Sequence, residues 1–125
     1  MNKKYYKYFA IIFLSLPVIF NLARADEASA TKPQTQILQR TSVPGTDNQL
    51  GMELIQFPPN SIKSPHIHSW AEIIYVLQGE ITFRVQGQPS KTVKAGESFQ
   101  IPIGVSHNTQ VGPHGAKLIA AWVMK

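Results

Sequence analysis

The segment His66-Ile67-His68-Ser69-Trp70-Ala71-Glu72 contains the residues best suited to chemistry. Side chains two residues apart in a β-strand point to the same face, so His66 and His68 can act together, and Glu72 has the same parity. A third histidine, His107, follows further along the chain. Three imidazoles and one carboxylate are ligands that suit a divalent transition metal ion. The pattern therefore indicates a candidate metal site.

Such a site would be open to small molecules. Four protein ligands on an ion that accepts five or six leave one or two positions for water, oxygen or a chelating substrate. A closed structural zinc site more often uses cysteine, which this chain lacks. We therefore expect chemistry rather than a purely structural ion. The ligand types admit Fe, Mn, Ni, Cu or Zn and do not select one of them.

The first 25 residues have the three parts of a secretory signal. A basic start contains Lys3, Lys4 and Lys7, residues 8–20 form an apolar run, and Ala23-Arg24-Ala25 places small residues two apart. We expect cleavage after Ala25 and a periplasmic or secreted protein. The alternative is an uncleaved membrane anchor, but the run is short for a bilayer span of about 20 residues.

The charge of the chain changes once this segment is set aside. The whole sequence has a formal net charge of +5, but the part after residue 25 has 8 basic and 7 acidic residues, a net charge of +1. No basic cluster with interleaved aromatic residues remains, so we expect no nucleic-acid partner and, after cleavage, no membrane partner. The absence of cysteine excludes disulfides and thiolate metal sites.

The rest of the chain has the pattern of an all-β protein. Residues 26–36 are small and polar and are expected to be a flexible mature N-terminus, followed by one domain over residues 37–125. Short β-like segments alternate with glycine and proline turns, and no segment has a sustained helical period. A β-barrel or jelly roll is expected. The eight predicted strands are residues 37–42, 50–57, 72–77, 81–85, 91–94, 98–101, 107–111 and 117–123.

One predicted strand is apolar on both faces. Residues 73–77 read Ile-Ile-Tyr-Val-Leu, so one face should point into the barrel and the other against a second sheet or a second subunit. The N-terminal strand at residues 37–41 has no obvious cover. Together these features favour a homodimer.

Two longer motifs resemble those of the cupin superfamily. The first runs from the histidine pair to Gly79 and the second ends at His107; they read His66-x-His68-x3-Glu72-x6-Gly79 and Gly96-x5-Pro102-x-Gly104-x2-His107. The resemblance covers residues 50–124. It implies a small double-stranded β-helix, the jelly-roll barrel of cupins. It also implies that the metal ligands are His66, His68, Glu72 and His107, lining the barrel near one open end.

The chain departs from the cupin motifs at two positions. The first motif usually begins with glycine, where this chain has Asn60, and the second usually ends with asparagine, where it has Val111. Asparagine tolerates left-handed backbone angles better than most residues, so the first change is mild. Neither change removes an implied metal ligand.

The resemblance specifies the residues of the site but not the reaction, because cupins include dioxygenases, isomerases, decarboxylases and non-catalytic binding domains. We expect a metal-dependent oxidoreductase of the dioxygenase type that acts on a small oxygenated molecule, such as an enol, a phenol or an organic acid. Glu72 could both ligate the metal and accept a proton. The alternatives are a non-catalytic cupin that binds a metal or small ligand, and an isomerase or lyase that uses the metal as a Lewis acid.

Several other aromatic and histidine side chains could be considered for the site, but most are better explained by structural roles. Phe83, Phe99 and Trp122 are expected in the barrel core. Trp70 could border the pocket or lie on the surface, and His114 is expected to be an exposed turn residue rather than a ligand.

Overall fold

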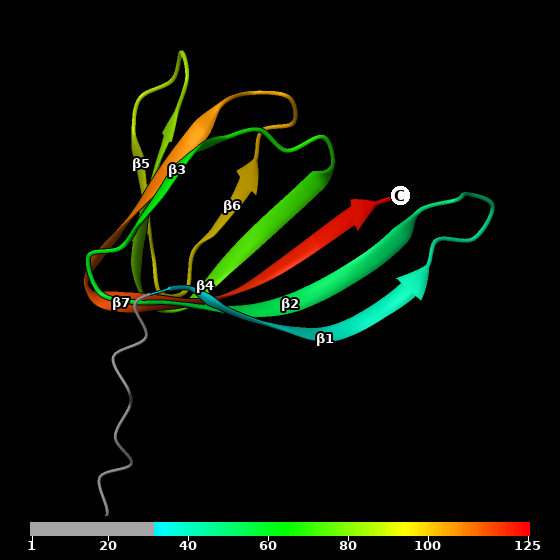
Figure 1. Cartoon of the computed structure of the whole chain (residues 1–125), viewed down its shortest axis with the longest axis horizontal. Coiled ribbons are helices and arrows are strands. Elements are labelled where there is room, and N and C mark those ends of the chain that lie inside the picture. The colour runs from blue at the N-terminus through cyan, green and yellow to red at the C-terminus, as the bar shows by residue number, and fades with distance from the viewer. Residues whose placement is uncertain (1–31) are drawn as a thin grey trace, which may run out of the picture.

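The alternating apolar and polar residues form seven β-strands in the computed structural model, which describes residues 32–125 (Figure 1). The expected signal at residues 1–25 lies outside the described residues. No helix within residues 32–125 is long and apolar enough to cross a membrane. The strands are β1 (Gln34–Ser42), β2 (Gln49–Phe57), β3 (Ile62–His66), β4 (Ala71–Val85), β5 (Lys91–Lys94), β6 (Ser98–Ile101) and β7 (His107–Met124).

The all-β fold predicted from the sequence is confirmed, with differences in the number of strands. The segments at residues 72–77 and 81–85 form one long strand, β4, and those at 107–111 and 117–123 form another, β7. Glycines that resemble turn signals lie inside these strands and bend them. The short strand β3 was not among those predicted, and β1 begins at Gln34, within the segment expected to be flexible.

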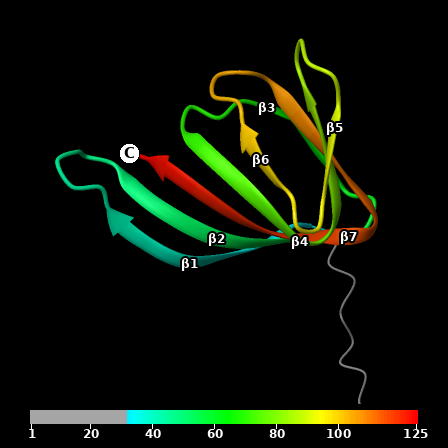
Figure 2. The same cartoon turned by 180° about the vertical axis from the view of Figure 1, so that it is seen from behind.

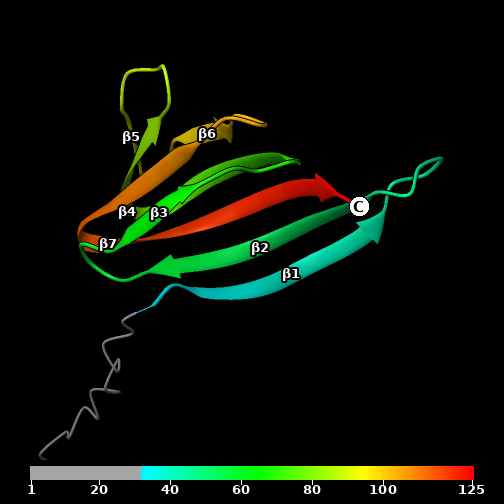
Figure 3. The same cartoon turned by 45° about the horizontal axis from the view of Figure 1, so that its top comes forward.

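The two long strands organise the sheet. β4 and β7 pair antiparallel along nearly their whole length, so that the first half of each lies beside the second half of the other. β2 and then β1 extend the sheet from the second half of β7, and β6 flanks the first half of β4. β3 pairs with the first half of β7, and β5 pairs with the second half of β4. The sheet therefore folds over on itself into two facing layers (Figures 2 and 3).

The fold-over occurs where β4 and β7 bend together. Gly79 and Gly115 both have positive φ angles, +73° and +76°. A Cβ atom on Gly79 would collide with the carbonyl oxygen of Gly115, so the two backbones approach too closely for a side chain. Register shifts in β4 on either side of Gly79 accommodate the bend, as β-bulges do at barrel corners.

The core lies between the two layers. It consists mainly of aliphatic side chains that point inward from β4 and β7, and burying each of the larger ones contributes about 1.5–3 kcal/mol. Phe83 and Phe99 stack within it with ring centroids 4.6 Å apart, and Trp122 is buried, which confirms the sequence-based assignment. The largest fully buried side chains are Ile81, Leu118, Val76 and Val93.

The outer face of the larger layer is apolar and exposed. Ile74 and Val76 point into the core, whereas Ile73 and Tyr75 point outward and are 55% and 46% exposed. The predicted two-sided apolar character of this strand is therefore correct, but within residues 32–125 no second sheet covers its outer side.

The paired bend gives a direct test of the fold. We expect Gly79→Ala to lower the free energy of unfolding by about 3 kcal/mol or more, because it adds a backbone collision to the strain of a positive φ. Gly87→Ala is a matched control, since Gly87 has a φ of +78° but open space around it. It should cost only about 1–2 kcal/mol. Urea unfolding of both variants measures the difference, and equal losses would show that the approach of β4 to β7 is not tight.

Candidate metal centre

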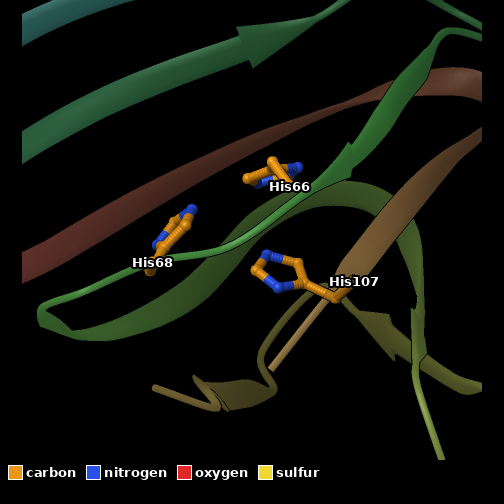
Figure 4. Close-up of side chains that lie close together, drawn as sticks. All are labelled: His66, His68 and His107. Atoms are coloured by element: carbon orange, nitrogen blue, oxygen red, sulfur yellow. The ribbon is translucent and has the colours of Figure 1, made fainter. Parts of the chain in front are cut away.

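Three histidines converge at one end of the core (Figure 4). His66 ends β3 and His107 begins β7, and they are direct partners in the register of these strands. His68 follows β3 in a short bridge to Ile103. The potential ligand atoms of the three side chains lie within 4.8 Å of one another. Residues far apart in the chain are thus brought into one cluster, as the sequence predicted.

Backbone carbonyls set the orientation of two of these rings. Nδ1 of His66 lies 2.8 Å from the oxygen of Ser64, and Nδ1 of His107 lies 3.2 Å from the oxygen of Val105. A carbonyl oxygen only accepts, so in a neutral ring each Nδ1 carries the proton and donates it. The Nε2 lone pair of both rings is then available for a metal ion, as is usual for metal-binding histidines.

Glu72 lies beside the histidine cluster, next to His68. Its Oε2 atom is 2.6 Å from Nδ1 of His68 and accepts a hydrogen bond of 3.2 Å from the indole of Trp70. The Trp70 ring also stacks on His68, with centroids 4.8 Å apart. Trp70 therefore orients both neighbours and does not line the cavity itself. Glu72 is outside the group formed by the three histidines but lines the same cavity.

The donor atoms fit a divalent transition metal ion. Nδ1 of His68 is buried, and the Glu72 oxygen at 2.6 Å is its nearest polar neighbour. A proton on this Nδ1, donated to the carboxylate, satisfies both atoms and leaves Nε2 of His68 available for an ion, as in the other two rings. Three imidazole nitrogens about 2.1 Å from one ion lie on average no more than about 3.6 Å apart, so the rings would have to approach one another by up to about 1 Å on binding.

Burial keeps two of the histidines in the neutral form that metal binding requires. Burial, with smaller effects from the charges of His107 and Lys63, lowers the pKa of His68 to about 4. Burial also lowers the pKa of His66. Both rings are thus neutral at pH 7. Burial raises the pKa of Glu72, which the Trp70 hydrogen bond and nearby positive charges oppose.

A cavity of about 40 Å³ adjoins the cluster. This volume suits a small molecule rather than a polymer. Most of its wall is apolar and comes from both layers of the sheet. The lining residues are Ile55, Phe57, Lys63, His66, His68, Glu72, Ile74, Ile81, Phe83, Ile101, His107, Thr109 and Leu118.

The sequence analysis did not single out three polar residues near the site. Thr109 shares strand parity with His107 and could have been found from that. Lys63 has the opposite parity to His66, but a register shift between them turns it toward the cavity. Glu53 lies on β2, and burial together with the charge of Glu72 raises its pKa. A second carboxylate therefore lies within electrostatic reach of Glu72, in a chain otherwise poor in acids.

His114 is exposed and is not part of the cluster, as expected, although it lies in β7 rather than in a turn. Asn60 has a φ of 58°, so it adopts the left-handed conformation that the motif glycine would supply. The substitution at that position therefore preserves the local backbone.

Comparison with known proteins gives a consistent result. The family model for the Cupin domain matches residues 53–123. Germin-like protein 1-1 of Oryza sativa subsp. japonica is 42% identical over 89 residues, which are 65% of this chain and 41% of that protein. Oxalate oxidase GF-2.8 of Triticum aestivum is 36% identical over 90 residues, which are 63% of this chain and 40% of that protein. The chain thus matches less than half the length of these relatives.

A solved structure supports the fold. KdgF from Halomonas sp. superposes with a TM-score of 0.64 and 20% identity, over 76% of this chain and 82% of that one. At this level of identity the similarity concerns the architecture alone.

The buried, neutral His68 predicts a pH dependence of stability in metal-free protein. The unfolded ring takes up a proton near pH 6.5, whereas the folded ring does so only near pH 4. Acidification through this window therefore favours the unfolded state, by an amount on the order of 1–2 kcal/mol after allowance for solvent screening. The raised pKa of Glu72 has the opposite effect, so the measurement must compare variants.

We expect His68→Gln to lose less stability than the unaltered protein when the pH falls from 7 to 4, as measured by urea unfolding with chelator present. His114→Gln, at an exposed position outside the cluster, is the control and should follow the unaltered protein. Parallel curves for all three proteins would show that His68 is not buried in its neutral form.

Proposed function

The chain belongs to the cupin family, and from this premise we propose that it is a metal-dependent oxidoreductase of the dioxygenase type that acts on a small oxygenated organic molecule. The observation that carries the proposal is the convergence of His66, His68 and His107, with Glu72 beside them, on one small cavity. Similarity to a protein named oxalate oxidase supports an oxidoreductase with a small oxygen-rich substrate. Because the chain spans only part of that relative, its own activity requires a direct test.

In the proposed site the three histidines and Glu72 hold the ion. A bound divalent ion would hold and polarise oxygen atoms of the substrate. The hydrogen bonds from Nδ1 of His66 and His107 to backbone carbonyls keep those rings in place. Most of the cavity wall is apolar, which lowers the local polarity and strengthens electrostatic interactions beside it.

Glu72 is the group proposed to move a proton. Burial raises the pKa of this carboxylate, so it accepts a proton more readily than an exposed glutamate would. The Trp70 indole donates to Oε2 and keeps the carboxylate directed toward His68. Glu72 can therefore serve as a ligand and, when it loosens, as the proton acceptor.

We also propose that the protein is exported through the signal at residues 1–25 and works in the periplasm or outside the cell. The three-part pattern of that segment supports this. Export would require the chain to acquire its metal outside the cytoplasm, where binding strength favours Cu and Zn unless the site discriminates.

Elemental analysis of the exported protein, purified without chelator, tests the metal site. We expect close to one equivalent of a divalent transition metal, and a loss of at least tenfold in metal content in the double variant His66→Ala/His68→Ala. His114→Ala, which removes an exposed histidine outside the cluster, should retain the metal. A folded protein that contains no metal and takes none up would contradict the proposal.

The identity of the metal and an oxygen-uptake assay separate the alternative functions. Fe, Mn, Ni or Cu with oxygen consumption that is lost in His107→Ala supports the oxidoreductase. Turnover without oxygen uptake would indicate an isomerase or lyase, and ligand binding without turnover under any of these metals would indicate a non-catalytic cupin.

The exposed apolar face supports a second proposal, that the protein is a homodimer. Strands β2, β7 and β4 lie side by side, and each contributes an apolar side chain to two successive rows on the outer face. The rows are Met52-Ala121-Ile73 and Leu54-Ile119-Tyr75. An uncharged patch of this kind is typical of an interface, and a second copy offers an identical, self-complementary face.

Light scattering after size exclusion tests the dimer. We expect the unaltered protein to have twice the mass of the chain and the variant Ile73→Lys/Tyr75→Lys to be a monomer, because the variant would bury unpaired charges in the interface. Ile62→Lys, at a 70% exposed apolar position on β3, is the control and should remain a dimer. An unaltered protein that is monomeric at micromolar concentration would contradict this proposal.

A further inference from the structure

Lys63 brings a positive charge to the wall of the cavity. It lies on β3, directly opposite Thr109 on β7, and the register shift that follows it places it on the same side as His66. It lines the cavity together with the three histidines and Glu72. Among the lining residues identified within residues 32–125, it is the sole lysine or arginine.

The effect of this charge reaches every titratable group around the cluster whose pKa is displaced. Burial has the largest effect on these pKa values; the positive charge of Lys63 opposes the rise in the pKa of Glu72 and Glu53 and adds to the fall in the pKa of His66 and His68. Coulomb interactions weaken with distance and with solvent screening. The ammonium group therefore acts on the cavity rather than only on bulk solvent.

Thr109 offers an unused hydroxyl at the same place. Its side chain is only 4% exposed, it lines the cavity, and Oγ1 has no hydrogen-bond partner in the described part of the chain. A buried hydroxyl without a partner destabilises the folded protein. It can donate one hydrogen bond and accept two, so a ligand in the cavity can use it.

We infer that Lys63 and Thr109 form a carboxylate-binding subsite beside the histidine cluster, and that the substrate is a small organic acid. The inference rests on the proposed metal site. One end of the substrate presents oxygen atoms to that site, and a carboxylate at the other end accepts hydrogen bonds from the Lys63 ammonium and the Thr109 hydroxyl.

Charge and size both favour such a ligand. With a divalent ion, the Glu72 carboxylate and the Lys63 ammonium, the cavity carries a net charge of about +2, which attracts an anion. A charge-assisted hydrogen bond in a partly dehydrated site is stronger than a neutral one. The cavity volume of about 40 Å³ suits a small acid. Neutral enols and phenols would leave Lys63 without a partner on the ligand.

Titration calorimetry on the manganese-loaded exported protein tests the subsite, with malonate as the probe and monomethyl malonate as the matched ligand that lacks one charge. We expect Lys63→Met to weaken malonate binding about tenfold or more and to leave the monoester nearly unchanged. Lys63→Arg, which keeps the charge, should retain most of the affinity. Lys91→Met, which removes an exposed lysine of β5 outside the cavity, should bind like the unaltered protein.

Thr109 gives an independent readout. Thr109→Val should weaken malonate binding about threefold or more and at the same time raise the melting temperature of the ligand-free protein, because it removes a buried hydroxyl without a partner. Thr109→Ser, which keeps the hydroxyl, should bind nearly as well as the unaltered protein. A purely structural role for Thr109 would change stability without changing affinity.

The outcomes distinguish this inference from the proposed function. Normal manganese uptake with malonate binding that is insensitive to Lys63→Met, or equal losses for malonate and its monoester, would overturn the subsite alone. If the unaltered protein takes up no manganese or other divalent metal, the proposed function fails and the subsite fails with it.

Discussion

The close approach of β4 and β7 at Gly79 and Gly115 is the constraint on which the rest of the structure depends. Both strands bend there, and the bend turns one continuous sheet into two facing layers. Without it, β3 and the first half of β7 would not face the first half of β4. His66 and His107 come from one layer and Glu72 from the other. The backbone geometry at two glycines therefore helps to position the site.

The site combines an apolar wall with groups that burial keeps ready to bind a metal. Neutral imidazoles supply lone pairs. At His66 and His107, the hydrogen bond from Nδ1 to a backbone carbonyl leaves Nε2 as the nitrogen that can bind a metal. Burial works against charge on His66, His68 and Glu72, and a bound cation would offset that cost for the carboxylate. Lys63 itself is exposed, so solvent partly screens its effect on a bound anion.

The outer surface and the inner cavity depend on the same strands. In β4 alternate residues face the core and the exposed side, so Ile74 supports the cavity while Ile73 and Tyr75 form the apolar outer face. A partner on that face would stiffen β4 and β7 directly behind the cavity, because both strands contribute to the two surfaces. The proposed dimer and the proposed metal site would then be mechanically connected through shared strands.

The sequence by itself determined the all-β class, most of the strand segments and a set of four candidate ligands, because alternation and motif spacing are local properties of the chain. It also identified the tolerance of Asn60 for a left-handed backbone. Only the tertiary structure showed that Gly79 and Gly115 bend continuous strands instead of ending them, since their pairing is not local. Strict alternation along β3 would place the Lys63 side chain on the face opposite to His66. A bulge between these two residues turns Lys63 toward the site, and this bulge arises only when β3 pairs with β7.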